Sequence, residues 1–296
     1  MMSFEESKIL ITGSTGYIGK NVQKGFVNRC LNYDVLVNKF PFEVDFELNF
    51  EGYSFIIHAA GLAHGNQKSV EHSYNVNYKF PLELAKIAKR DGIKCFIFLS
   101  SASLYTPKRN GLLSEGDPIA AKNFLLQHKL RAENELLQMS TTNFSVVILR
   151  LPLVYSLDAP ANFSKLIRIS LLSKVQPFGL ANNKKSYLSV DNLVDALAAV
   201  VLSNNRNSGV YNLTDNRDLS LRELVALIRK SNSLATFHIP IPIHVFYLFL
   251  RLLKREDLFS LIFREHVISC KKFMSYYNWK PKVTPEDTLN IERNSR

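Results

Sequence analysis

The sequence predicts an α/β protein built on a doubly wound parallel sheet, with a smaller, mostly helical lobe toward the C-terminus. Short apolar runs alternate with longer stretches of helical periodicity through the first half of the chain, which is the pattern of strands joined by crossover helices. A glycine-rich turn separates the first run from the first helix. Sheets of this kind bind ligands at the carboxyl ends of their strands.

The expected elements alternate in chain order. Strands are predicted where apolar, β-branched and aromatic residues run together, at residues 8–11, 33–37, 55–58, 95–99 and 145–151. Helices are predicted at residues 17–27, 69–90, 123–139, 162–173 and 192–202. We therefore expect a dinucleotide-binding domain of residues 1–155 plus 187–213, and a substrate lobe of residues 156–186 plus 214–296.

The composition is that of a globular protein, with 46% hydrophobic and 21% charged residues in a chain of 296. Three widely spaced cysteines indicate neither a disulfide framework nor a zinc site, and no other metal site is indicated. Residues 1–8 include two acids and no apolar run, so we expect no secretory signal and a cytoplasmic location. The longest apolar stretch, residues 239–250, is too short to cross a bilayer.

The charge is strongly basic, and the excess lies in the C-terminal half. The formal net charge is +11, and residues 151–296 contain 20 Lys and Arg against 12 Asp and Glu. Nucleic acid is not an expected partner, because the bases are scattered rather than clustered among aromatics. A diphosphate substrate or an anionic membrane surface explains the bias more simply. Peripheral membrane association and a homodimer both stay open at this point.

The turn between the first strand and the first helix has the glycine spacing of a dinucleotide site. Gly13 allows a tight turn, Gly16 allows a pyrophosphate to approach the backbone, and Gly19 allows the helix to pack on the sheet. The helix N-terminus then offers amide donors to the phosphates. The residues expected to line the cofactor here are Gly13, Thr15, Gly16, Tyr17, Ile18 and Gly19.

The end of the second strand bears on the choice of cofactor. A carboxylate there would accept the ribose hydroxyl of NAD, whereas this chain has Asn38 and Lys39. Lys39 could instead pair with the 2′-phosphate of NADP. NADP is thereby favoured over NAD, unless Lys39 is simply a solvated surface charge.

Four motifs together make the chain resemble a known family. They are the glycine trio, the sequence His58-Ala59-Ala60-Gly61, and the segments at residues 99–105 and 149–155. The chain resembles the extended short-chain dehydrogenases and reductases, that is, the NAD-dependent epimerase/dehydratase family acting on nucleotide sugars. Segments at residues 161–163, 177–179 and 184–195 look most like the UDP-4-keto-6-deoxy-N-acetylhexosamine 4-reductases of O-antigen and capsule synthesis. The resemblance implies a Rossmann-like fold and a UDP-sugar substrate.

The resemblance also implies roles for particular residues. Asp45 and Phe46 would contact the adenine, unless Asp45 is a solvated loop residue. Ala60 and Gly61 would line the cofactor. Ser101 would bond the substrate oxygen at the reacting carbon; the alternative is a strand-end serine that caps local backbone. The substrate lobe would contribute Asn162 to the sugar diphosphate, Phe178 to the uracil and Lys185 to the phosphates, although an aromatic such as Phe178 is also ordinary core.

The catalytic motif of the family is incomplete. Lys129 matches the lysine that binds the nicotinamide ribose, but Leu125 occupies the position of the tyrosine that transfers the proton. Tyr105, His64 and His128 are the residues that could replace that tyrosine by position. Tyr105 matches a family tyrosine that is normally not catalytic. Without its partner, Lys129 could also be an ordinary surface lysine.

Three functions fit these observations. The first is a nucleotide-sugar 4-keto reductase with a displaced proton donor, the second is an epimerase or dehydratase, and the third is a silent member that only binds cofactor or sugar nucleotide. One further expectation concerns residues 243–254, where Val245, Leu248, Phe249 and Leu252 recur at helical spacing. We expect an amphipathic helix whose apolar stripe packs inside the smaller lobe.

Overall fold

The computed structural model describes residues 8–37, 48–62, 70–106, 108, 111–252, 259 and 263–290. Its centre is a six-stranded sheet in which every strand pair is parallel. The strands are β1 (Lys8–Thr12), β2 (Tyr33–Leu36), β3 (Tyr53–His58), β4 (Cys95–Ser101), β6 (Ser145–Leu151) and β11 (Gly209–Asn212). The predicted doubly wound sheet is confirmed; β11 is a strand that the sequence analysis did not predict.

The order of the strands places the site. Across the sheet they run β2-β1-β3-β4-β6-β11, so the order reverses direction between β1 and β3. In open α/β sheets, ligands bind in the crevice outside the carboxyl ends of the strands at such a reversal. The glycine turn follows β1 directly and therefore lies at this point.

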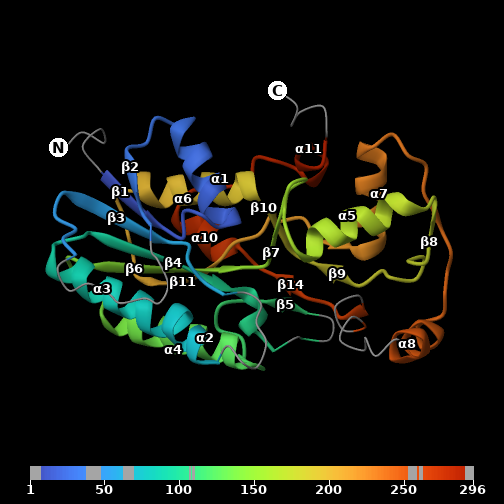
Figure 1. Cartoon of the computed structure of the whole chain (residues 1–296), viewed down its shortest axis with the longest axis horizontal. Helices are drawn as coiled ribbons and strands as arrows, with labels where there is room; N and C mark the ends of the chain where they lie inside the picture. Colours follow the sequence, from blue (N-terminus) through green and yellow to red (C-terminus); the bar gives the residue numbers. More distant parts are fainter. Residues whose placement is uncertain are drawn as a thin grey trace.

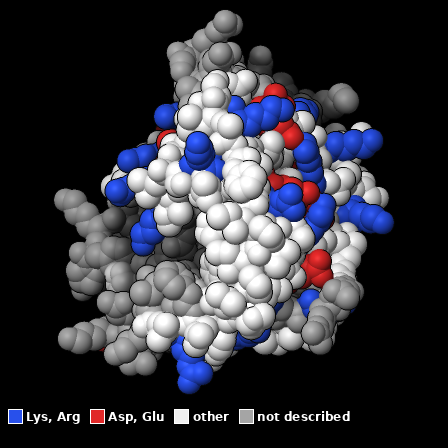
Figure 2. All heavy atoms as spheres, turned by 90° about the vertical axis from the view of Figure 1, so that its right-hand side faces the viewer, with Lys and Arg blue, Asp and Glu red and all other residues white. Residues whose placement is uncertain are grey.

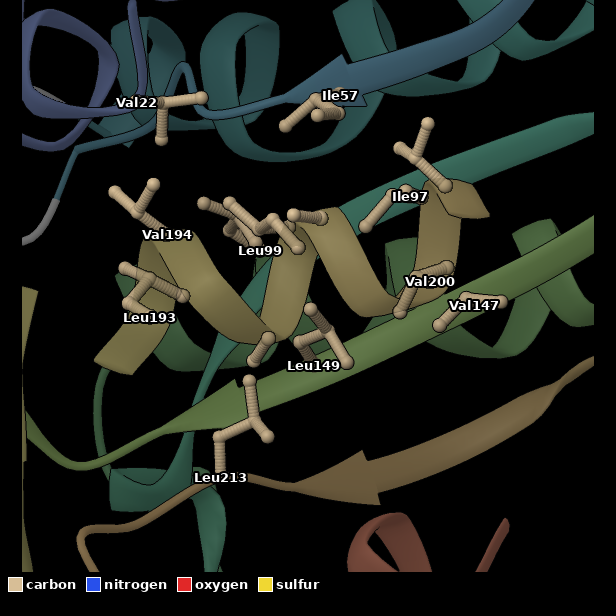
Figure 3. Close-up of a cluster of buried hydrophobic side chains, with 14 of the residues drawn as sticks. Val22, Ile57, Ile97, Leu99, Val147, Leu149, Leu193, Val194, Val200 and Leu213 are labelled. Carbon is tan, nitrogen blue, oxygen red and sulfur yellow. The ribbon is translucent and has the colours of Figure 1, made fainter. Parts of the chain in front are cut away.

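Helices cover both faces of the sheet (Figure 1). On one face lie α1 (Tyr17–Val27), α6 (Val190–Leu202) and α10 (Lys271–Tyr276), and on the other lie α2 (Val70–Tyr74), α3 (Phe80–Arg90) and α4 (Phe124–Gln138). Figure 3 shows α6 laid across the sheet, with its valines and leucines turned toward side chains of β3, β4 and β6. The two faces form separate hydrophobic clusters, as a doubly wound sheet requires.

The helix expected at residues 69–90 is divided in three. Between α2 and α3 the chain forms a π-helical turn, Asn75–Lys79. Pro81 follows at the start of α3, and it has no N–H to donate to the carbonyl of Asn77 four residues earlier. Asn77 is buried, and π-turns of this kind are frequent at functional sites. Periodicity alone does not reveal the interruption, because apolar residues continue through it.

The smaller lobe combines helices with short strand pairs. Its helices are α5 (Asn162–Leu172), α7 (Leu221–Ser231), α8 (Ile243–Leu252) and α11 (Pro285–Thr288). Its strand pairs are β8 (Val175–Gln176) with β13 (Phe237–His238) and β9 (Lys184–Lys185) with β12 (Leu219–Ser220). The pair β7 (Leu153–Tyr155) with β10 (Tyr187–Ser189) falls within the bounds expected for the dinucleotide-binding domain, and its Tyr155 and Tyr187 pack in one cluster with Phe163 of α5. A last pair, β5 (Leu112–Leu113) with β14 (Val267–Ile268), ties the lobe to the loop after β4. The remaining short element, η4 (Ala102–Leu104), is a 3-10 turn.

Helix α8 forms where the sequence predicted it, but its packing face was predicted wrongly. Phe246 and Leu250 face inward, whereas the predicted stripe points outward: Val245 is 47%, Leu248 56% and Leu252 75% exposed. The side chain of Phe249 lies outside the described residues. The helix is apolar on both sides, so spacing could not decide which side packs. Within the described part of the chain, no helix is long and apolar enough to cross a membrane.

Candidate functional site

The three glycines of the turn after β1 differ in what surrounds them. At Gly13 the backbone φ is +70°, and an added Cβ would lie 2.4 Å from the amide nitrogen of Ala60. At Gly19 an added Cβ would lie 2.2 Å from the carbonyl oxygen of Gly13. At Gly16 the nearest atom would be that same oxygen at 3.3 Å, and among the described residues no other atom beyond its chain neighbours lies within 4 Å. Gly13 and Gly19 are therefore required by packing, whereas Gly16 leaves open space in front of the turn.

The start of α1 provides the groups that an anion needs. Gly16 is the N-cap, in an extended conformation, and its N–H donates to the carbonyl of Gly13 at 3.0 Å. The first N–H groups of any helix lack acceptors within the helix and carry its positive end. The first turn of α1 contains no acid, and Thr15 beside it is exposed. The turn therefore fits a pyrophosphate, because Gly16 has no Cβ and leaves room for the anion next to the helix N-terminus.

Tyr17 and Ile18, which the motif predicts to line the cofactor, also anchor α1 to the rest of the protein. The Tyr17 hydroxyl and the Ser156 hydroxyl are 2.5 Å apart, which links α1 to the smaller lobe. Burial raises the pKa of Tyr17 above its usual value, so its phenol stays neutral. Ile18 packs against the hydrophobic cluster beneath α1 and α6. Both side chains fix the position of the helix whose N-terminus faces the site.

Lys129 lies inside the protein, on α4. Its side chain is buried, and its Nζ donates to the carbonyl of Leu99 at 3.4 Å and lies 5.6 Å from the centre of the Phe98 ring. An added Cβ on Gly61 would lie 2.9 Å from this Nζ. The structure thus brings together the loop after β3, the end of β4 and α4. The surface-lysine alternative does not hold for Lys129.

The environment of Lys129 contrasts with that of Arg150, a second buried cation close by. Arg150 holds Glu133 through its Nη2 at 2.6 Å and its Nε at 3.1 and 3.2 Å, with both side chains almost fully buried. Glu133 follows Lys129 by one helical turn, but it is oriented toward Arg150. Among the described residues, Lys129 makes no ion pair within 4 Å. Burial therefore lowers the pKa of Lys129 to about 8, despite some attraction from Glu133.

Two buried polar side chains support the loop after β3. His58 shares a hydrogen bond of 2.8 Å with the Thr12 hydroxyl and packs among three phenylalanine rings. Burial, with the nearby Lys129, lowers its pKa to about 3, so the ring is neutral. Asn77 accepts from the Leu62 N–H at 2.8 Å and donates to the Leu62 carbonyl at 3.0 Å. Sequence reasoning missed Asn77, because no local pattern marks its bond to a loop fifteen residues earlier.

Leu125 lies on α4 one turn before Lys129 and is 7% exposed. Asn123 caps this helix by accepting from the Leu126 N–H at 3.0 Å. His128, on another side of α4, is 2.9 Å from the Ser73 hydroxyl and edge-on to Tyr74. Burial lowers its pKa. His128 is therefore engaged with α2.

Tyr105 occupies a different neighbourhood. Its hydroxyl donates to Asn212 Oδ1 at 2.8 Å, and the Arg150 guanidinium lies 4.9 Å from its ring centre. Burial raises its pKa, although Arg150 opposes the shift. Ser101, at the end of β4, accepts from the Ser103 N–H at 3.2 Å. The Ser100 hydroxyl is buried and has no hydrogen-bond partner among the described residues.

The smaller lobe reaches the end of β4 through His266, a residue that the sequence analysis did not single out. Lys185 and His266 form an isolated parallel bridge, and the His266 ring bonds the backbone of Ala102. Burial lowers the pKa of Lys185 to about 8, and burial together with Lys185 lowers that of His266 to about 4. No local pattern could indicate a contact between residues so far apart in sequence.

The other predicted ligand contacts stand as follows. Phe178 is buried in a cluster with Phe246, their ring centres 6.3 Å apart. Asn162 begins α5, but its side chain is not among those that the structure describes. Lys39, Asp45, Phe46 and His64 all lie outside the described residues.

Comparisons with known proteins agree with the fold. Residues 9–214 match the family described as "NAD dependent epimerase/dehydratase family". A UDP-glucose 4-epimerase of Vibrio cholerae is 28% identical over 94% of this chain and 92% of its own length. The solved structure of MoeE5 in complex with UDP-glucuronic acid and NAD superposes with a TM-score of 0.72 at 20% identity, covering 98% of this chain and 99% of that one. For RMD of Pseudomonas aeruginosa complexed with NADPH, the TM-score is 0.74 at 18% identity, with coverages of 97% and 96%.

Proposed function

Because this chain belongs to the NAD-dependent epimerase/dehydratase family, we propose that it binds NAD or NADP at the turn after β1 and acts on a UDP-sugar. The observation that carries the proposal is the buried Lys129, which forms no ion pair with a described carboxylate and faces Gly61 beside the switch point of the sheet. A buried cation that is not paired with a carboxylate is costly. A bound ligand that uses the charge would offset this cost.

Each part of the site has a role in this proposal. The open side of Gly16 and the first amides of α1 receive the pyrophosphate. Gly61 keeps the approach to Lys129 clear, and Lys129 binds the ribose next to the nicotinamide. When bound, the reduced nicotinamide supplies the hydride that a keto sugar requires. Lys185, joined to the end of β4 through His266, supplies charge for the sugar diphosphate.

The proposed reaction is reduction of a UDP-4-keto-6-deoxy-hexosamine, in the cytoplasm, for surface polysaccharide synthesis. The carbonyl carbon gains a hydride and the carbonyl oxygen a proton. Leu125, in the place of the family tyrosine, cannot supply that proton. The Tyr105 hydroxyl already donates to Asn212, and His128 is engaged with Ser73, so neither is a ready substitute. His64, the remaining candidate, lies outside the described residues. We expect a slow reductase, because general acid help is typically worth roughly 10²–10⁴-fold.

Two alternatives have support of their own. The Vibrio cholerae relative is named as an epimerase, and an epimerase returns the hydride to its substrate and keeps its cofactor. The leucine at position 125 supports a member that binds ligand without turnover.

Cofactor turnover separates these functions. The protein is mixed with NADPH or NADH and a UDP-4-keto-6-deoxy-N-acetylhexosamine, and loss of the reduced-nicotinamide absorbance is followed with product analysis. A reductase consumes cofactor in proportion to product. Interconversion of UDP-sugars without net consumption would identify an epimerase, and tight binding without either would identify a silent member. Lys129→Gln should weaken cofactor binding, whereas Lys122→Gln, at an exposed lysine just before α4, should not.

A further inference from the structure

One end of the smaller lobe exposes an unusual amount of apolar surface. The exposed side chains are Ile169 and Leu172 of α5, Val175 of β8, Phe237 of β13, and Ile243, Val245, Leu248 and Leu252 of α8. Leu172 is 83% and Phe237 66% exposed. Single apolar residues on a surface are ordinary, but a group of this extent marks an interaction site. We call it the lobe-end face.

The elements of this face are joined to one another. Strands β8 and β13 pair in parallel, Val175 opposite Phe237, and the Phe237 N–H donates to the Lys174 carbonyl at 2.8 Å. Arg229 of α7 donates to the carbonyls of Ser170 and Ser173, which fixes the end of α5 beside them. A short loop then leads from β13 into α8. The face therefore belongs to one packed region, seen at the right of Figure 1.

Helix α8 shows most clearly that something covers the face. Its inner side chains, Phe246 and Leu250, fill the cluster around Phe178 and Val225. Its outer side chains, Val245, Leu248 and Leu252, are equally apolar and lie exposed. A helix that is apolar all round is normally buried on all sides.

The charges around the face decide what kind of partner fits. Residues 159–190 and 224–252, which include α5, β8, β13 and α8, contain no Asp or Glu, although Asp158, Asp191 and Glu223 directly flank these ranges. Exposed bases accompany the apolar side chains, among them Lys165, Arg168, Lys174 and Lys230. Figure 2 faces this end of the molecule and shows an uncharged surface through its middle, with many Lys and Arg and few acids at its edges.

We propose that the lobe-end face rests on an anionic lipid membrane, with the outer side of α8 and the exposed residues of β8 and β13 in the interfacial layer. Apolar side chains with basic neighbours are the combination that binds anionic lipid surfaces. A second copy of the chain fits less well. A two-fold dimer would place this face against itself, so the bases of one copy would meet those of the other.

Sedimentation with vesicles tests the proposal. The full chain is mixed with vesicles of phosphatidylcholine alone, or of phosphatidylcholine and phosphatidylglycerol in equal parts. We expect binding to the anionic vesicles and little to the neutral ones. Leu248→Glu with Leu252→Glu should lower the vesicle affinity about tenfold or more, because two apolar contacts are lost and two negative charges meet an anionic surface. Val27→Glu is the matched control, since Val27 is 61% exposed on α1 in the other lobe, and should change little.

A charge-reversed pair completes the test. Arg168→Glu with Lys174→Glu should also lower the affinity about tenfold or more, because each base near an anionic surface is worth about 1 kcal/mol. Lys24→Glu, an exposed lysine of α1, is the control. Absence of binding to anionic vesicles, or equal binding to neutral ones, would overturn the proposal. The proposal would also be overturned if the charge-reversed pair lowered the vesicle affinity and the leucine pair did not. Light scattering that shows a dimer dissociated by the leucine pair would instead assign the face to a second copy.

Discussion

The turn after β1 and the middle of α4 are two parts of the site that we propose, and they differ in how fully they match the pattern expected from the family resemblance. In the turn, the two glycines that packing requires and the one that leaves open space are all present. On α4, the lysine is present and buried, but Leu125 stands one turn before it. In the proposed function, binding of a dinucleotide and transfer of a proton are separate requirements assigned to separate elements. A chain can keep the first while it changes the second.

The largest effect is expected at the turn. Gly16→Val places a side chain where the pyrophosphate is proposed to bind, and among the described residues its Cβ would meet only the Gly13 carbonyl. We expect cofactor affinity to fall by about 10²-fold or more, with the melting temperature nearly unchanged. Titration with NADH and NADPH, alongside thermal unfolding, measures both. Unchanged affinity would refute the proposed cofactor site.

Gly19→Ala is the contrasting variant. Its Cβ would lie 2.2 Å from a backbone oxygen, so the turn itself must move. We expect a loss of stability of about 1–3 kcal/mol, the range for overpacking.

The second effect is expected on α4. Leu125→Tyr restores a phenol one turn before Lys129, and the cation would favour the phenolate. We expect turnover of a UDP-4-keto-6-deoxy sugar to rise by up to ~10²-fold. Leu125→Phe, which has the same ring without the hydroxyl, is the matched control and should give no gain. If both variants raise turnover equally, the gain comes from the aromatic ring and not from the hydroxyl. The explanation that the site lacks a general acid then fails.

The third effect concerns the free energy of unfolding. It distinguishes Lys129, a cation proposed to bind ligand, from Arg150, a cation that holds the structure together. The pKa of Lys129 is lowered to about 8 from 10.5, so the folded state binds its proton less tightly than the unfolded state. Below about pH 8 both states are protonated and the cost of burying the charge is fully present; the cost disappears as pH rises from about 8 to 10.5. Lys129→Met should therefore stabilise the cofactor-free protein at pH 7, by on the order of 2 kcal/mol.

The control for that variant is the paired cation nearby. Arg150→Met leaves the Glu133 carboxylate buried without its partner, so we expect destabilisation of about 3–5 kcal/mol. Denaturant unfolding at pH 7 and at pH 10 measures both variants. If Lys129→Met and the parent are equally stable at pH 7, burying the charge of Lys129 has no free-energy cost and this explanation fails.

Much of the sheet and the glycine turn could be predicted from sequence, because short-range patterns specify them. Strand β6 has the predicted bounds, 145–151, and α1 the predicted bounds, 17–27. The supports of the site could not be predicted in this way. Asn77 bonds Leu62 and His266 bonds Ala102, and neither contact leaves a local pattern. The outward side of α8 was missed because both of its sides are apolar.

The smallest effect is expected at Tyr105, the tyrosine that sequence position alone offers as a substitute donor. Its hydroxyl donates to buried Asn212, whose own backbone N–H bonds Glu115. Tyr105→Phe leaves the Asn212 oxygen without this donor, which should cost about 1–2 kcal/mol of stability. The pH dependence of turnover should keep its shape, because a phenol used inside the protein does not exchange protons with substrate. A lost limb in the pH profile, with stability unchanged, would show instead that Tyr105 is the proton donor that α4 lacks.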